Sequence, residues 1–91
     1  MNKNVTTHKE TLNRLSRIAG QVNGVVRMIE EEEYCIDIIT QIQAARSALQ
    51  SVSKIILEKH IRHCVTDARN SPDEVDVKIE EIMTAVKRLS K

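Results

Sequence analysis

Residues 35–64 read "CIDIITQIQAARSALQSVSKIILEKHIRHC" and contain neither glycine nor proline. Apolar residues recur through this stretch at three- and four-residue intervals, at Ile38, Ile39, Ile42, Ala45, Leu49, Val52, Ile56 and Leu57. The spacing predicts one α-helix from Cys35 to about Arg69, roughly 33 residues and about 50 Å long at 1.5 Å per residue. We expect so long a helix in a chain of 91 residues to pack against something larger than its own subunit.

The segments on either side predict two more helices. Thr7 followed by Glu10 fits a capping box, and apolar residues at helical spacing continue from there, so we expect a first helix over residues 7–32. The stretch "NSPDEV" (70–75) indicates a break and a restart, with Ser71 as N-cap and Pro72 at the first helical position, and predicts a third helix over residues 72–90. The chain is therefore predicted to be all-α, with a single domain over residues 1–91.

Glycine is rare in this chain, and both copies lie inside the first predicted helix. Gly20 and Gly24 each cost about 1 kcal/mol relative to alanine in a helix interior. We interpret their four-residue spacing as a sign of close helix packing.

The net charge of +1 hides an uneven distribution. Residues 1–29 carry several basic side chains against Glu10 alone, whereas residues 30–33 are four glutamates. A basic first helix can attract phosphate even in a nearly neutral chain. The N-terminal sequence lacks the apolar core of a signal peptide and no apolar run approaches a membrane span, so we expect a cytoplasmic protein with reduced thiols and no membrane partner.

Two potential metal ligands stand at the end of the quoted stretch. His60 and Cys64 are four residues apart and share one face of the helix. Cys35 lies within roughly 20° of both around the helix axis, but about 37 Å away along it. A second copy of the helix, antiparallel about a two-fold axis near Leu49, would bring Cys35 of one chain opposite residues 60–64 of the other. The sequence thus predicts an intersubunit site, present twice in a dimer.

The ligand types indicate the ion. Structural zinc usually takes four protein ligands, and magnesium or calcium takes oxygens, whereas two thiolates and one imidazole suit Cu(I). A cysteine on an apolar stripe can also be inertly buried, and a histidine at a helix end can be a capping cation. His8 or His63 could supply a fourth ligand to nickel, cobalt or zinc.

Three stretches together resemble the copper-sensitive operon repressor family, the CsoR/RcnR group of bacterial metal-responsive transcriptional repressors. They are "RLSRIAGQVNGVVRMIE" (14–30), "YCIDIITQIQAARSAL" (34–49) and "HIRHC" (60–64), and the resemblance covers nearly the full length. It implies that Cys35, His60 and Cys64 bind copper, and that Tyr34 and Glu80 support these ligands and link them to the third helix.

The same resemblance implies an assembly and a DNA surface. Three-helix subunits would form an antiparallel four-helix-bundle homodimer, and two dimers a homotetramer. The family binds DNA through a broad basic face on its first two helices, which here implies contacts from Arg14, Arg17 and Arg46.

The branches of the family differ at positions that can be read in this chain. The nickel and cobalt branches add a histidine that would align with Lys3, the formaldehyde branch typically has glutamate in place of Cys64, and the persulfide branch lacks the histidine that stands here as His60. The copper branch fits best.

We therefore expect a non-enzymatic repressor that binds operator DNA without metal and is released by Cu(I). The alternatives are a persulfide- or nickel/cobalt-responsive repressor of the same family, or a cytosolic copper-buffering protein that does not bind DNA. The absence of a C-x-x-C motif argues against a thiol enzyme.

Overall fold

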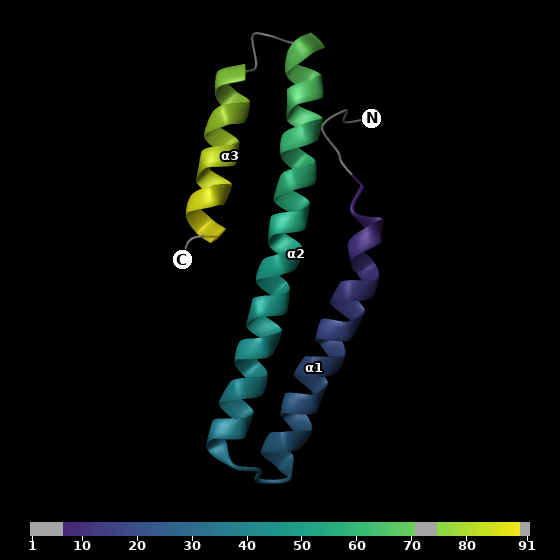
Figure 1. Cartoon of the computed structure of the whole chain (residues 1–91), viewed down its shortest axis with the longest axis vertical. Coiled ribbons are helices and arrows are strands. Elements are labelled where there is room, and N and C mark those ends of the chain that lie inside the picture. Colours follow the sequence, from purple (N-terminus) through teal and green to yellow (C-terminus); the bar gives the residue numbers. More distant parts are fainter. Residues whose placement is uncertain (1–6, 71–74, 90–91) are drawn as a thin grey trace. The chain divides into compact units, whose positions relative to one another are not determined.

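The structure is a computed structural model. It describes the backbone of residues 7–70 and 75–89 and the side chains of these residues except 65–70. A short 3-10 helix, Lys9–Thr11, leads into three α-helices, α1 (Leu12–Glu30), α2 (Cys35–Asn70) and α3 (Val75–Leu89) (Figure 1). Every regular element in these residues is helical, which confirms the all-α prediction. Within the same residues, none of the helices is both long and apolar enough to cross a membrane.

The chain divides into two compact units. The α1 unit comprises Lys9–Val52, and the α3 unit comprises Ser53–Lys91 together with Met1–His8. Helix α2 begins in the first unit and continues into the second. Each unit is described by itself.

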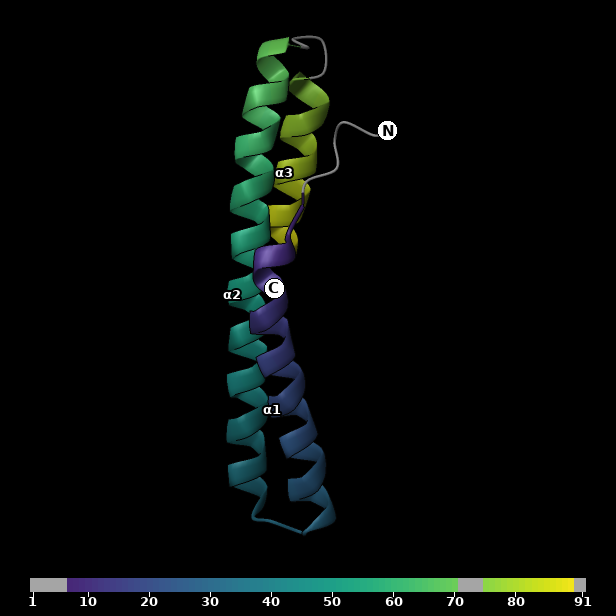
Figure 2. The ribbon, with the colours of Figure 1, turned by 90° about the vertical axis from the view of Figure 1, so that its right-hand side faces the viewer.

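In the α1 unit, α1 runs antiparallel beside the first half of α2, as both ribbon views show (Figures 1 and 2). Ile18 of α1 and Ala45 and Val52 of α2 are its buried apolar side chains. They recur at seven-residue spacing on α2, as expected for one stripe facing a neighbouring helix.

The start of α1 differs from the sequence-based expectation. Helical structure begins at Lys9 rather than at residue 7, its first turn is 3-10, and the N-cap of α1 is Thr11. Thr11 has helical dihedral angles (φ −88°, ψ −8°) and makes no side-chain cap hydrogen bond. The preceding 3-10 turn explains this difference, because it enters the α-helix in a nearly helical conformation and leaves Thr11 outside the extended geometry of a capping side chain.

The end of α1 also falls short of the predicted residue 32. The amide of Glu33 donates to the carbonyl of Met28 (2.9 Å), and that of Glu32 donates to Ile29 (3.1 Å). This pair of bonds is a Schellman motif, with Glu32 in the left-handed conformation at φ 56°. Glycine usually occupies that position, so a run of four glutamates carried no signal for the helix end.

Helix α2 agrees with the prediction of one helix from Cys35 to about Arg69. For the third helix, Ser71 and Pro72 lie outside the described residues, and the described part, Val75–Leu89, falls within the predicted range. The packing role expected for the glycines is wrong within this chain. A Cβ on Gly20 would meet nothing within 4 Å, and one on Gly24 would meet only the flexible guanidinium of Arg27 at 3.9 Å.

Large apolar side chains remain exposed along both helices of the α1 unit. They are Leu12, Val22, Val26, Ile29, Ile36, Ile39, Ile42 and Leu49. Exposed apolar side chains that adjoin one another in a patch usually mark an interaction site. The exposure supports the expectation that α2 packs against more than its own subunit.

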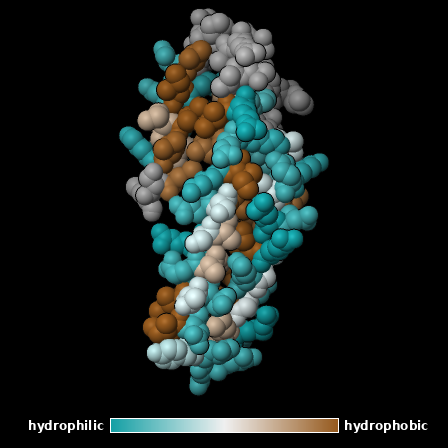
Figure 3. Space-filling model, in the orientation of Figure 1, coloured by the Kyte–Doolittle hydropathy of each residue, from teal (hydrophilic) through white to brown (hydrophobic). Residues whose placement is uncertain are grey.

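In the α3 unit, α3 lies alongside the second half of α2, and apolar side chains gather over these two helices in the space-filling view (Figures 1 and 3). A hollow of about 710 Å³ lies between them; its lining includes Ile56, Leu57, His60, Val77, Glu80 and Glu81. On α2, Lys59 donates through Nζ to the carbonyl oxygen of Thr7 (2.5 Å), one residue before His60 in the sequence.

Candidate metal centre

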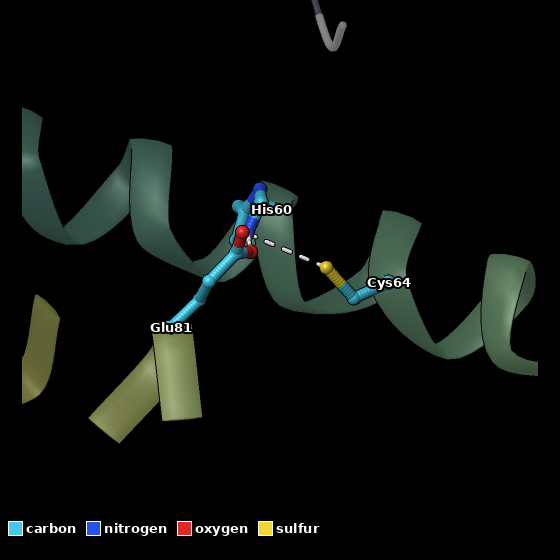
Figure 4. A network of polar contacts seen from close by, with 3 residues as sticks. All are labelled: His60, Cys64 and Glu81. Carbon is cyan, nitrogen blue, oxygen red and sulfur yellow. Dashed lines mark hydrogen bonds and ion pairs between the residues drawn. The ribbon is translucent and has the colours of Figure 1, made fainter. Parts of the chain in front are cut away.

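His60 and Cys64 make direct contact on α2. The Nε2 atom of His60 lies 3.3 Å from the Sγ atom of Cys64, as expected for residues one helical turn apart (Figure 4). Cys64 is buried, with 3% of its surface exposed. The predicted pairing of these two side chains on one helix face is present in the structure.

A third side chain reaches the same nitrogen from α3. The Oε2 atom of Glu81 lies 3.6 Å from Nε2 of His60, so this one ring nitrogen faces both a carboxylate and a thiol (Figure 4). The side chains of His60 and Glu81 are 31% and 55% exposed, and a pair so open to water contributes little to stability. Its importance is positional, because it ties α3 to a potential metal ligand.

The resemblance had singled out Glu80 for this support, and sequence reasoning missed Glu81. Glu80 lines the same hollow between α2 and α3, but the carboxylate measured against His60 belongs to its neighbour. In the sequence "KIEEIM" (78–83) the two glutamates are indistinguishable. Only the rotation of α3 against α2 separates them.

Cys35 and Tyr34 stand at the other end of α2. Cys35 is the first residue of the helix and is exposed, and Tyr34 just before it is 68% exposed. Within a single subunit, Cys35 is therefore not buried. Within residues 7–64 and 75–89, no three His, Cys, Asp or Glu side chains gather into a group able to hold an ion.

The basic residues separate into two places in the α1 unit. Arg14 and Arg17 of α1 line one hollow against α2, together with Gln21 and Ser51. Arg46 is exposed on α2 and follows the buried Ala45. It is not part of the lining of that hollow.

The donor atoms present fit a soft ion. Nitrogen and sulfur ligands bound to one metal at about 2.0 and 2.3 Å, with an angle near 110°, lie about 3.5 Å apart. The 3.3 Å between Nε2 and Sγ needs only a small adjustment to reach that separation. Both groups must be deprotonated to bind, and a third soft ligand would complete a set suited to Cu(I).

Comparison with known proteins places these residues in a family. The model of the metal-sensitive transcriptional repressors matches residues 7–88. The copper-sensing transcriptional repressor RicR of Mycobacterium tuberculosis is 49% identical over 77 residues, which cover 84% of this chain and 80% of RicR.

Two solved structures share the fold. The copper-sensing repressor CsoR with Cu(I) from Geobacillus thermodenitrificans superposes with a TM-score of 0.80 at 40% identity, covering 96% of this chain and 93% of that one. The nickel-responsive transcriptional regulator InrS superposes with a TM-score of 0.77 at 32% identity, covering 92% and 93%. The chain belongs to the metal-sensitive transcriptional repressor family.

Proposed function

We propose that this chain is a copper-responsive repressor, which binds operator DNA without metal and is released when Cu(I) binds between two subunits. Cys35 of one subunit and His60 and Cys64 of its partner would hold the ion. The observation that carries the proposal is the 3.3 Å contact between Nε2 of His60 and Sγ of Cys64, two soft ligands already side by side. The copper-sensing relatives and the Cu(I)-bound neighbour support this choice of ion.

The exposed surface supports an assembled protein. Cys35 is exposed at the start of α2, and Ile39, Ile42 and Leu49 follow it with their apolar side chains in water. An antiparallel second copy of α2 would cover these side chains and complete both metal sites at once. A dimer, and a tetramer built from two dimers, are therefore part of the proposal.

The division of the chain explains how the ion could act on DNA. Cys35, Arg14 and Arg17 belong to the α1 unit, whereas His60 and Cys64 belong to the α3 unit. A ligand set of Cys35 with the partner's His60 and Cys64 joins the α1 unit of one subunit to the α3 unit of another. Copper then releases DNA if the subunit arrangement that completes the site differs from the arrangement that holds DNA.

Glu81 would take part in this response. In the structure its carboxylate lies at the same nitrogen that faces Cys64. A nitrogen that binds metal has no proton to share with a carboxylate, so binding at Nε2 and the contact with Glu81 exclude each other. Loss of that contact would free α3 from His60. The supporting role of Tyr34 and Glu80 is still a prediction from the family resemblance.

A complementation experiment tests the intersubunit site. One variant carries Cys35→Ala, the other carries His60→Ala and Cys64→Ala, and neither has a complete ligand set in a homodimer. In a mixed dimer, Cys35 of the second chain and His60 and Cys64 of the first restore one site of two, so a statistical mixture should bind about 0.25 Cu(I) per chain tightly. A mixture that binds no more tightly than its components would contradict the intersubunit site.

A second experiment tests the inducer and the DNA function. The metal-free protein selects a duplex from a random-sequence pool, and its binding is titrated with Cu(I), Ni(II), Zn(II) and polysulfide. We expect tight, salt-dependent binding that Cu(I) weakens by at least tenfold. Release by Ni(II) but not Cu(I) would favour the nickel alternative that the InrS neighbour suggests, and failure to select any duplex would favour a copper buffer.

A further inference from the structure

A hollow of about 310 Å³ lies between α1 and α2 within the α1 unit. Its floor is apolar, and its rim carries four polar side chains from the two helices. The lining residues are Arg14, Arg17, Ile18, Gln21, Ala48, Ser51 and Val52. The rim therefore gathers polar groups from two elements that are distant in the sequence.

Helix geometry explains why these side chains line the same hollow. At 100° per residue, Arg14, Arg17 and Gln21 lie within about 60° of one another around α1, at the edge of the buried Ile18. Ser51 precedes the buried Val52 on α2 and stands at the matching edge of that helix. The packing of Ile18 and Val52 thus holds the two polar edges on either side of the hollow.

The chemistry of the rim fits an anion. The lining contains two guanidinium groups and no carboxylate. Arginine, glutamine and serine side chains all carry hydrogen-bond donors, and arginine matches phosphate through two parallel bonds. All four polar side chains are exposed, so their donors are accessible from solvent.

The hollow lies away from the surface assigned to a second copy. Around α1, the exposed apolar residues Leu12, Val22, Val26 and Ile29 centre roughly 130° from the stripe of Arg14, Arg17 and Gln21. Around α2, Ser51 lies about 160° from the exposed Leu49. A partner that covers the apolar stripe leaves the hollow open.

We propose that this hollow clamps one DNA backbone phosphate, with Gln21 and Ser51 donating neutral hydrogen bonds to the phosphate that Arg14 and Arg17 neutralise. The inference rests on the proposed operator binding, and it adds two residues to the DNA surface. It assigns them a role different from that of the arginines. Positive charges release counterions from DNA, whereas neutral donors hold the phosphate without doing so.

This difference gives a specific signature. Loss of one neutral hydrogen bond weakens binding by about 2- to 10-fold. Because no counterion is involved, the slope of log affinity against log salt stays unchanged. Loss of an arginine also lowers that slope by about one.

The experiment compares Gln21→Ala, Ser51→Ala and Arg17→Ala with two matched controls. Gln43→Ala and Ser47→Ala remove the same side-chain types from exposed positions of α2 outside the hollow. Each metal-free variant is titrated with the selected duplex over a salt series. Circular dichroism checks that its helices are intact, which alanine at an exposed helical position favours.

We expect Gln21→Ala and Ser51→Ala to weaken binding 2- to 10-fold at every salt concentration, with the wild-type slope, and both controls to bind like wild type. If Gln21→Ala and Ser51→Ala behave like the controls while Arg17→Ala loses affinity and slope, the clamp is wrong and operator binding stands. If the wild-type protein binds no duplex, both the clamp and the repressor function are wrong.

Discussion

Leu49 offers the sharpest test of the proposed subunit contact. It is 45% exposed in one chain, and the two-fold axis inferred from the spacing of the metal ligands passes close to it. In an antiparallel dimer the two copies of Leu49 would therefore face each other. Leu49→Asp would replace this apolar contact with two facing carboxylates.

The expected loss can be worked from the exposure. Full burial of a leucine is worth about 1.5–3 kcal/mol, so covering the exposed half contributes about 1 kcal/mol per copy and about 2 kcal/mol per dimer. Two carboxylates about 6 Å apart at an effective dielectric constant of 20 repel by about 3 kcal/mol. The sum of about 5 kcal/mol raises the dimer dissociation constant between about 10³- and 10⁴-fold.

Sedimentation velocity over a dilution series measures this shift, and titration against a chromophoric Cu(I) chelator measures the metal site in the same samples. Leu49→Asp should sediment as a monomer and lose tight copper binding, although all three ligands are unchanged. Ser47→Asp adds the same charge at an exposed position of α2 about 160° away and should leave both properties intact. A Leu49→Asp protein with the wild-type oligomeric state and copper affinity would refute both the inferred axis and the intersubunit site.

Three further substitutions test local features. Glu32→Gly should raise the free energy of unfolding by about 1 kcal/mol in urea denaturation, because glycine adopts φ 56° without the steric cost that glutamate carries; an unchanged midpoint would argue against this backbone conformation. Gly20→Ala should stabilise by a similar amount, about 1 kcal/mol, because its Cβ meets nothing within 4 Å, and a destabilised variant would mean that another copy packs there. Glu81→Gln should leave copper affinity within about fivefold but reduce the release of DNA by Cu(I), since a surface pair at His60 is worth up to about 1 kcal/mol. Glu80→Gln is the matched control, and the reverse result would return the role to Glu80.

The helices were predictable because apolar periodicity is a local property. Residues 35–64 carry no breaker, and α2 accordingly runs unbroken from Cys35 to Asn70. The helix ends were less predictable, because they depend on backbone conformations that side chains signal only by tendency. Glu32 adopts a glycine-like conformation at the end of α1, and the N-cap of α1 is Thr11, without a side-chain cap hydrogen bond, rather than the predicted Thr7.

The site was predictable only in the part that lies on one helix. The contact of His60 with Cys64 follows from their four-residue spacing. Which of Glu80 and Glu81 lies near His60 depends on the rotation of α3, and the presence of Gln21 and Ser51 in the lining of one hollow depends on how α1 packs on α2. A local sequence pattern predicts neither the rotation of a helix nor its packing register.

The placement of the proposed metal ligands and DNA contacts limits how the protein could signal. The hollow with Arg14 and Arg17 lies in the α1 unit, and His60 and Cys64 lie in the α3 unit, so the described lining of the hollow contains neither ligand. A response to copper must then pass along α2, which runs through both units, or across the subunit interface through Cys35. Only the second route makes the response depend on a ligand from another chain. Mixed dimers with one complete site therefore separate the routes: half of the wild-type release of DNA would indicate independent sites acting along each helix, whereas none or all of it would indicate a change of the whole interface.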